Sequence, residues 1–361
     1  MGGAARADSA TNRFFNARAE IHFLQAQKEY QAATNSTTNK QVILGNLTNN
    51  NQVGAGGIVN NGDGTLTFSN TIFNSTTGAT VTTVSRTLTL GGSNVGDNKI
   101  AGIIQNNASG AATVLTKTGV GTWILAGTNT FSGNINLNAG TLVAATGSAF
   151  GSANAARTIT VSSGALLRFD SGNVMNGTFA STSVPTIIVN SGTVTNNFGN
   201  NNALGNITLN NSTLDSTAGS VTYGAFNING TLTSTGNSTI ASSEPITGRM
   251  MLSNTGTIFN VTIGELTISA PLAAVAREGH LGSFTKNGSG TLRLNGANTY
   301  SGSTTLNGGV TTVGAGGTLG SGLAALSVNG TSTILDLATD SHTVVGSLSG
   351  TGTPTIYNGG S

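Results

Sequence analysis

The chain has 361 residues, of which 53 are Gly, none is Cys and 7% are charged, and its formal net charge is +2. Without Cys it forms no disulfide, no thiolate metal site and no Cys nucleophile. The Lys and Arg residues are scattered and give no basic patch for nucleic acid. No apolar run approaches the ~18–20 residues that span a bilayer.

The N-terminus shows no signal peptide, because Met1-Gly2-Gly3 lacks an apolar segment. Ala5-Arg6-Ala7, just before Asp8, has the small-x-small pattern found at the end of a cleavage site. We therefore expect a mature or truncated chain of a secreted protein.

Residues 12–33 predict a helix, because they contain no Gly or Pro and are rich in Ala, Glu, Gln, Lys and Arg. The helix carries two apolar stripes, whereas a helix that covers a single surface needs one. Two interpretations stay open: the helix caps its own molecule, or it caps it and also contacts a neighbouring subunit. The second assigns the subunit contact to six apolar residues of the stripes: Phe14, Phe15, Ile21, Phe23, Leu24 and Tyr30. With the polar residues 34–40 as a linker, residues 1–40 are predicted to be separate from residues 41–361.

From residue 41 onward, short apolar alternations recur between turns rich in Gly and Asn, which is typical of β-strands with one buried face. Two segments, 115–142 and 284–311, share one pattern and are displaced by 169 residues (286 − 117) without a gap. Each contains a strand, a turn, a second strand, a corner and a third strand. Such a repeat predicts one winding of a parallel β-solenoid and the start of the next.

The repeated positions are predicted to be structural. Gly residues supply turns in which positive φ is favourable. The rings of Phe131 and Tyr300 precede Ser-Gly at equivalent corners, which favours packing over stacking on sugars. The repeat positions are Lys117, Gly119, Gly121, Gly127, Asn129, Phe131 and Gly133, and their counterparts Lys286, Gly288, Gly290, Gly296, Asn298, Tyr300 and Gly302.

The pattern Lys-x-Gly-x-Gly-Thr-hydrophobic-x-Leu-x-Gly-x-Asn-Thr-aromatic-Ser-Gly, at residues 117–133 and 286–302, resembles the autotransporter-associated β-strand repeat, also called the passenger-associated transport repeat. The resemblance implies an all-β, right-handed parallel β-helix that is extracellular or exposed on a bacterial surface. It also implies that the repeat serves folding and export. The second copy departs from the family pattern, because Gly309-Val310-Thr311 stands where Gly-Thr-Leu is usual.

Candidate chemistry is sparse. Glu278 lies near His280, and Asp336 and Asp340 lie near His342, but acid–base catalysis needs two such groups that converge on one substrate. The remaining carboxylates considered are far apart in the sequence: Asp170, Asp215, Glu244 and Glu265. We therefore predict no catalytic, cofactor-binding or metal-binding residue.

The predicted function is that of a non-enzymatic structural protein of a bacterial surface, with itself as partner. Open ends of a solenoid expose strand edges that pair with further strands, and a head-to-tail contact propagates into a filament. Two alternatives stay open. An adhesin passenger would bind surface glycans or host proteins along its Thr/Ser/Asn-rich face, and clustered exposed aromatic residues would favour it. A polysaccharide lyase or hydrolase would need convergent carboxylates.

Overall fold

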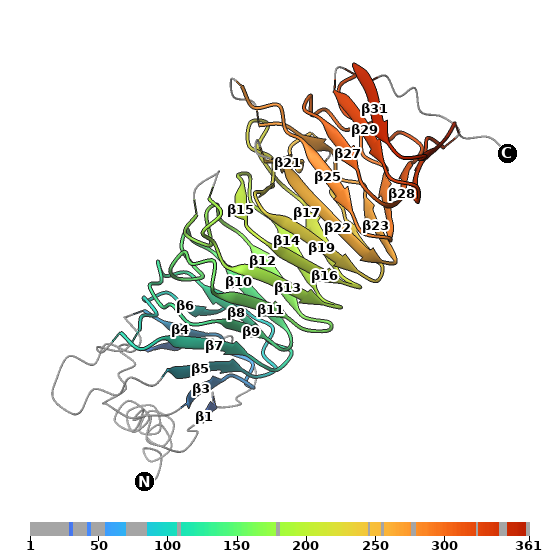
Figure 1. Ribbon diagram of the computed structural model, residues 1–361. Coiled ribbons are helices and arrows are strands. Elements are labelled where there is room, and N and C mark those ends of the chain that lie inside the picture. Colours follow the sequence, from blue (N-terminus) through green and yellow to red (C-terminus); the bar gives the residue numbers. More distant parts are fainter. Residues whose placement is uncertain are drawn as a thin grey trace, which may run out of the picture.

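The computed structural model describes residues 29–31, 42–44, 55–69, 85–106, 110–177, 181–244, 246–253, 256–275, 279–322, 324–338 and 345–358. Within these ranges the chain forms strands β1 to β32 and no helix. Two 14-stranded parallel sheets, here called sheet A and sheet B, stack their strands along a rod with β1 near one end and β31 near the other (Figure 1). Consecutive strands alternate between the two sheets along most of the chain. The fold is therefore an all-β parallel β-solenoid, as the sequence predicts.

Sheet A faces one side of the rod. Its strands are β1 (Glu29–Gln31), β3 (Ala55–Val59), β5 (Arg86–Gly91), β7 (Thr113–Lys117), β9 (Ile135–Leu137), β11 (Thr158–Val161), β13 (Thr186–Asn190), β16 (Ile207–Asn210), β19 (Thr231–Thr235), β22 (Thr257–Ile263), β25 (Phe284–Asn287), β27 (Thr304–Leu306), β29 (Ala325–Asn329) and β31 (Ser347–Thr351).

Sheet B faces the other side. Its strands are β2 (Val42–Leu44), β4 (Leu66–Phe68), β6 (Asn98–Ile100), β8 (Thr122–Leu125), β10 (Thr141–Ala144), β12 (Leu166–Phe169), β14 (Thr193–Asn196), β17 (Thr213–Ser216), β20 (Ser238–Ile240), β23 (Glu265–Ile268), β26 (Thr291–Leu294), β28 (Gly309–Val313), β30 (Thr333–Asp336) and β32 (Thr355–Tyr357).

A third, four-stranded sheet widens the middle of the rod. It consists of β15 (Asn202–Leu204), β18 (Phe226–Ile228), β21 (Met250–Leu252) and β24 (Leu272–Ala273). Windings that contribute to this sheet have three strands instead of two.

The core lies between the sheets and is a stack of like residues. Leu115, Ile135, Ile159 and Ile187 are successive partners on sheet A, and each is at most 1% exposed. Burying such a side chain contributes about 1.5–3 kcal/mol relative to leaving it in water. Because alternate residues of each strand point inward, the period-two pattern of the sequence sets which residues form the core.

Aromatic side chains extend this core. Phe150, Phe169 and Phe226 form one edge-to-face series with centroid distances of 5.6 and 5.8 Å. Phe259, Phe284 and Tyr300 form a second, at 5.3 and 5.6 Å. Such geometry adds to the free energy gained from buried area.

The predicted helix over residues 12–33 is wrong at its C-terminal part. Glu29–Gln31 is strand β1, which pairs in parallel with residues 57–59 of β3. Helix propensity is a weak local preference that tertiary pairing overrides. Residues 12–28 lie outside the described residues, and so do five of the six predicted contact residues, Phe14, Phe15, Ile21, Phe23 and Leu24. The sixth, Tyr30, lies in β1 opposite Ile58.

No helix among the described residues has the length and apolar character needed to cross a membrane.

Candidate functional site: the two repeat motifs

Each repeat motif spans two neighbouring windings. The first copy runs through β7, β8, β9 and β10, and the second through β25, β26, β27 and β28. Within a copy, the first strand pairs with the third in sheet A, and the second pairs with the fourth in sheet B. The sequence predicts three strands in each motif, and the structure adds a fourth, β10 or β28, which gives two strands in each of the two windings.

Lys117 and Lys286 point into the solenoid and are 0% exposed. The stem of Lys117 lies in register between Leu90 and Leu137, so its methylene groups continue the aliphatic stack. The stem of Lys286 lies between Phe259 and Leu306 in the same way.

The ammonium groups of these lysines bind the turns that join the two sheets. Nζ of Lys117 donates hydrogen bonds to the carbonyl oxygens of Thr118, Gly119 and Ala139 at 2.8, 2.6 and 3.0 Å. Nζ of Lys286 donates to the carbonyl oxygens of Gly288, Gly290 and Gly308 at 2.6, 2.8 and 2.7 Å. In each copy the third acceptor belongs to the next winding. Each lysine therefore joins two successive turns through all three of its donors.

Burial disfavours the charge on these two lysines. It lowers the pKa of Lys117 and of Lys286 from 10.5 to about 8. At neutral pH both groups keep their proton, because about 8 still lies above 7.

Asn129 and Asn298 join three successive windings. Oδ1 of Asn129 accepts a hydrogen bond from the Ile104 amide at 2.7 Å, and its Nδ2 donates to the Ala149 carbonyl at 2.6 Å. Oδ1 of Asn298 accepts from the Leu272 amide at 2.7 Å, and its Nδ2 donates to the Thr318 carbonyl at 2.7 Å. Each buried amide thus satisfies one main-chain group in the winding before it and one in the winding after it.

The glycines of the motif allow close stacking. Gly119 and Gly288 have φ of +68° and +83°, where a side chain is unfavourable. A Cβ atom on Gly133 would lie 2.2 Å from the Thr113 carbonyl oxygen, and one on Gly302 would lie 2.0 Å from that of Gly282. At the other positions a Cβ would also lie 2.1–2.8 Å from a carbonyl oxygen of another winding: Gly121, Gly127, Gly290 and Gly296.

The corner rings are core residues. Trp123, Phe131 and Tyr300 are 0% exposed, so they present no face on which a sugar could stack. The Arg157 guanidinium lies 5.1 Å from the Phe131 ring centroid and donates to the Gly133 and Phe150 carbonyls. Burial lowers the pKa of Arg157 to about 10.

The Tyr300 side chain hydrogen-bonds a hydroxyl, whereas the Phe131 ring packs against the Arg157 guanidinium. The hydroxyl of Tyr300 is 2.6 Å from Oγ1 of Thr304, and burial raises its pKa. The Tyr300 hydroxyl is therefore satisfied within the core.

The second copy departs from the first at Thr311. This residue pairs with Leu292 and Leu335 at a core position that Leu142 occupies in the first copy. Thr311 is 1% exposed, and its hydroxyl finds no hydrogen-bond partner among the described residues. The departure from the usual Gly-Thr-Leu pattern thus places a polar atom in the apolar interior.

Sequence reasoning missed an asparagine ladder on the outside of sheet A. Nδ2 of Asn307 donates to Oδ1 of Asn287 at 3.0 Å, and Nδ2 of Asn329 donates to Oδ1 of Asn307 at 3.0 Å. Thr351 ends the ladder by donating to Asn329 at 3.3 Å. The available signal was three Asn-Gly pairs spaced by 20 and 22 residues (307 − 287; 329 − 307) at the ends of predicted strands.

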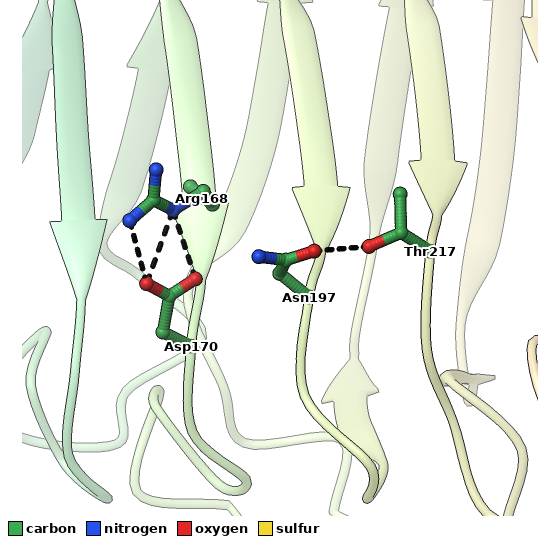
Figure 2. Close-up of polar contacts among 4 residues, drawn as sticks. All are labelled: Arg168, Asp170, Asn197 and Thr217. Carbon is green, nitrogen blue, oxygen red and sulfur yellow. Dashed lines mark hydrogen bonds and ion pairs between the residues drawn. The ribbon is translucent and has the colours of Figure 1, made fainter.

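Two of the candidate carboxylates form ion pairs with arginines. Asp170 forms an ion pair with Arg168 at 2.7 Å, and Glu265 forms one with Arg293 at 3.0 Å. The Arg293 hydrogen bond is the main cause that lowers the pKa of Glu265. Figure 2 shows Arg168 and Asp170 on the outer face of sheet B, beside the contact between Asn197 and Thr217 across neighbouring windings.

Among the described residues there is no group of three or more His, Cys, Asp or Glu side chains that could hold a metal ion. Asp336 accepts a hydrogen bond from the Ala338 amide. The candidates Glu278, Asp340 and His342 lie outside the described residues.

Residues 115–144 and 284–313 match the family model described as Passenger-associated-transport-repeat. The chain carries two passenger-associated transport repeats. The matched ranges end at Ala144 and Val313, which are the last residues of β10 and β28. Each passenger-associated transport repeat therefore coincides with the pair of windings that its buried lysine joins.

A curated relative is the "Adhesin BmaC autotransporter" of Brucella suis biovar 1 (strain 1330). It is 48% identical over 67 residues, which are 19% of this chain and 2% of the relative. No solved structure matches the chain. The resemblance noted from the sequence is confirmed for residues 115–144 and 284–313, and the chain is a β-solenoid that carries two passenger-associated transport repeats.

Proposed function

We propose that the chain is a non-enzymatic rod, exposed on a bacterial surface, that associates end to end with a second copy through its last described winding. The two passenger-associated transport repeats and the relative named as an autotransporter adhesin support the surface location. The self-association rests on the geometry of β31 and β32.

Both strands of this winding are exposed at every residue. Leu348 is 60% exposed, although its partner Leu326 in β29 is 4% exposed. Ile356 is 42% exposed, although its partner Leu335 in β30 is 1% exposed. These two side chains occupy core positions that a further winding would cover.

A second copy fits this end for two reasons. Among the described strands, β31 and β32 are the last of their sheets and have no neighbour on their outer edges. Exposed strand edges are templates for pairing. Leu348 and Ile356 supply apolar area that favours association in water. Because the two ends of one rod differ, the contact is head to tail and propagates.

The absence of catalysis is supported by the pairing of the carboxylates. Asp170 and Glu265 are each bound by an arginine, and the described residues hold no group of three or more His, Cys, Asp or Glu side chains. A hydrolase or lyase would need two acid–base groups facing one substrate.

The test is negative-stain electron microscopy and light scattering of the purified chain at rising concentration. We expect fibres for the unchanged protein and single rods for the double variant Leu348→Lys/Ile356→Lys. The matched control is Ile263→Lys/Leu281→Lys, which changes two apolar residues that are 70% and 55% exposed outside this winding. Single rods of the unchanged protein at all concentrations would overturn the proposed self-association.

A deletion tests the predicted subunit contact. Removing residues 1–28 takes away Phe14, Phe15, Ile21, Phe23 and Leu24 but keeps strand β1. Because the sequence assigns the other side of the contact to these apolar residues, we expect the shortened chain to remain a single rod. Fibres that form equally well without residues 1–28 would assign the contact to the solenoid alone.

A further inference from the structure

The two sheets present different outer faces. The outward positions of sheet B include six charged residues: Lys99, Arg168, Asp215, Glu265, Arg293 and Asp336. Two rows of outward positions run along sheet A from β5 to β31, and neither row contains a charged residue. Since the same windings build both sheets, this difference is a property of the faces and not of the overall composition.

The two rows of sheet A carry mainly hydroxyl and amide groups, and every member is at least partly exposed. The first row is Thr87, Val114, Asn134, Thr158, Thr186, Asn206, Thr231, Ile258, Thr285, Thr305, Ser327 and Ser349. The second is Thr89, Thr116, Asn136, Thr160, Ile188, Thr208, Thr233, Asn260, Asn287, Asn307, Asn329 and Thr351. Only Val114, Ile188 and Ile258 interrupt the polar pattern, and they lie on separate strands.

The register makes these rows a lattice. The successive partners on β7, β9, β11, β13 and β16 are Thr116, Asn136, Thr160, Ile188 and Thr208. Neighbouring strands lie about 4.8 Å apart, and alternate residues along a strand lie about 6.6 Å apart. The face therefore offers hydrogen-bonding groups at regular spacing in two directions.

Part of the lattice is held in place before any ligand binds. In the asparagine ladder, the Asn307 amide gives one donor to Asn287 and receives one from Asn329. An amide has two donors and two lone pairs. Within the described part of the chain, one donor and one lone pair of Asn307 are therefore left to bind outward. Preorganised groups lose less conformational entropy on binding.

We propose that the outer face of sheet A binds a neutral polysaccharide, an inference that rests on the proposed role as a surface-exposed passenger. A charge-free face gives no attraction to anionic lipids or nucleic acids. It also lacks the clustered apolar anchors that dominate protein interfaces. Because it has no aromatic residue, a polysaccharide would bind this face by hydrogen bonds and not by stacking on rings. A long polymer of hydroxyl groups matches a long lattice of hydroxyl and amide groups.

The binding depends on the number of contacts. Each hydrogen bond replaces one made with water and contributes little by itself. Many such contacts along one polymer add together, because each later contact is intramolecular. We therefore expect binding to long or insoluble polysaccharides and none to short oligosaccharides.

The test is co-sedimentation with insoluble cellulose, curdlan and chitin, with soluble alginate as the anionic probe in a gel-shift assay. Thr208→Lys/Thr233→Lys places two charges on adjacent strands of sheet A, and Thr213→Lys/Thr239→Lys places the same charges on sheet B in the same windings. We expect the sheet A variant to lose about tenfold or more in affinity, as for several lost contacts, and the sheet B variant to bind as the unchanged protein does. Thr208→Ala/Thr233→Ala, which adds no charge, is expected to weaken binding in the same direction.

Three results would overturn the proposal: no binding to any neutral polysaccharide, equal loss in the sheet A and sheet B variants, or a lateral dimer through sheet A instead of glycan binding. All proteins are also measured in the Leu348→Lys/Ile356→Lys background. Polysaccharide binding by single rods separates this inference from the proposed end-to-end association, because either can fail while the other holds.

Discussion

Two buried lysines and one buried threonine show how single residues set the properties of this solenoid. Lys117 and Lys286 place a charge inside the core, and each offsets the cost with three hydrogen bonds to turn carbonyls. Thr311 places a hydroxyl in the same core without a partner among the described residues. The lysines join successive windings, whereas the Thr311 hydroxyl only lowers the stability of the fold.

The lysines make stability depend on pH in a direction that follows from their pKa. In the folded chain the pKa is about 8, below the 10.5 of an exposed lysine, so the folded state releases its protons first as the pH rises. Between pH 8 and 10.5 the unfolded state binds more protons, and the free energy of unfolding rises with pH. Up to pH 9.5 each lysine contributes up to about 2 kcal/mol of this rise.

The measurement is the urea midpoint at pH 7 and pH 9.5 for the unchanged chain and for Lys117→Met/Lys286→Met. We expect the urea midpoint of the unchanged chain to increase relative to that of the double variant between pH 7 and pH 9.5. Lys99→Met, on the outer face of sheet B, is the control for loss of a positive charge. Parallel pH profiles for the unchanged chain and the double variant would contradict the assignment of this pH dependence to Lys117 and Lys286.

Replacing Thr311 by Val is expected to stabilise the protein. The change keeps the shape of the side chain and removes a buried hydroxyl that lacks a partner, which is worth about 1 kcal/mol. The contrasting variant is Thr304→Val, which leaves the buried Tyr300 hydroxyl without its partner and costs about 1–3 kcal/mol. Urea denaturation measures both, and a destabilised Thr311→Val would mean that the hydroxyl is satisfied.

At the scale of elements, the decisive feature is how closely one winding lies on the next. Gly133 and Gly302 occupy equivalent corners where the main chain of the previous winding passes directly over the Cα position. Asn129 and Asn298 then hydrogen-bond the windings on both sides. Close approach and bridging amides together fix the register of β8 and β26 with their neighbours.

Replacing Gly133 by Ala is expected to destabilise the protein by about 1–3 kcal/mol, the cost of overpacking. The added methyl group would lie 2.2 Å from the Thr113 carbonyl oxygen, so the windings must separate. Gly147→Ala is the matched control, because its Cβ would lie 3.5 Å from the nearest atom and its φ is ordinary. Thermal unfolding followed by circular dichroism compares the two, and equal melting temperatures would show that the corner relaxes freely.

At the scale of the whole molecule, the rod is a linear stack in which each winding contacts only its neighbours. Internal strands such as β11 and β12 pair on both sides, whereas β31 and β32 pair on one side. The stability of such an array is a sum of local terms, so its ends open first.

Hydrogen exchange is therefore expected to be slowest in β11–β23 and fastest in β31 and β32. Mass spectrometry of peptides at low protein concentration measures this gradient. Protection of β31 and β32 should increase with concentration, because end-to-end association covers them. Uniform exchange along the rod would mean that it opens as one cooperative unit.

The sequence by itself determined the solenoid, its inward residues and the two repeats, because the alternation of apolar residues and the recurrence of Gly, Lys and Asn are local and periodic. It predicted that the repeat positions are structural, and Phe131 and Tyr300 are buried. It did not predict that Glu29–Gln31 is a strand, because local propensity there favours a helix and only pairing with β3 reverses it.

Only the tertiary structure decided which residues meet across windings. The windings vary from 19 residues, between Trp123 and Leu142, to 32 residues, between Gly56 and Leu88, so partners do not fall at a fixed spacing in the sequence. The asparagine ladder, the third acceptor of each lysine and the separation of charged and uncharged faces all depend on this register. They arise from contacts between distant segments, and such contacts are set by stacking rather than by any local pattern.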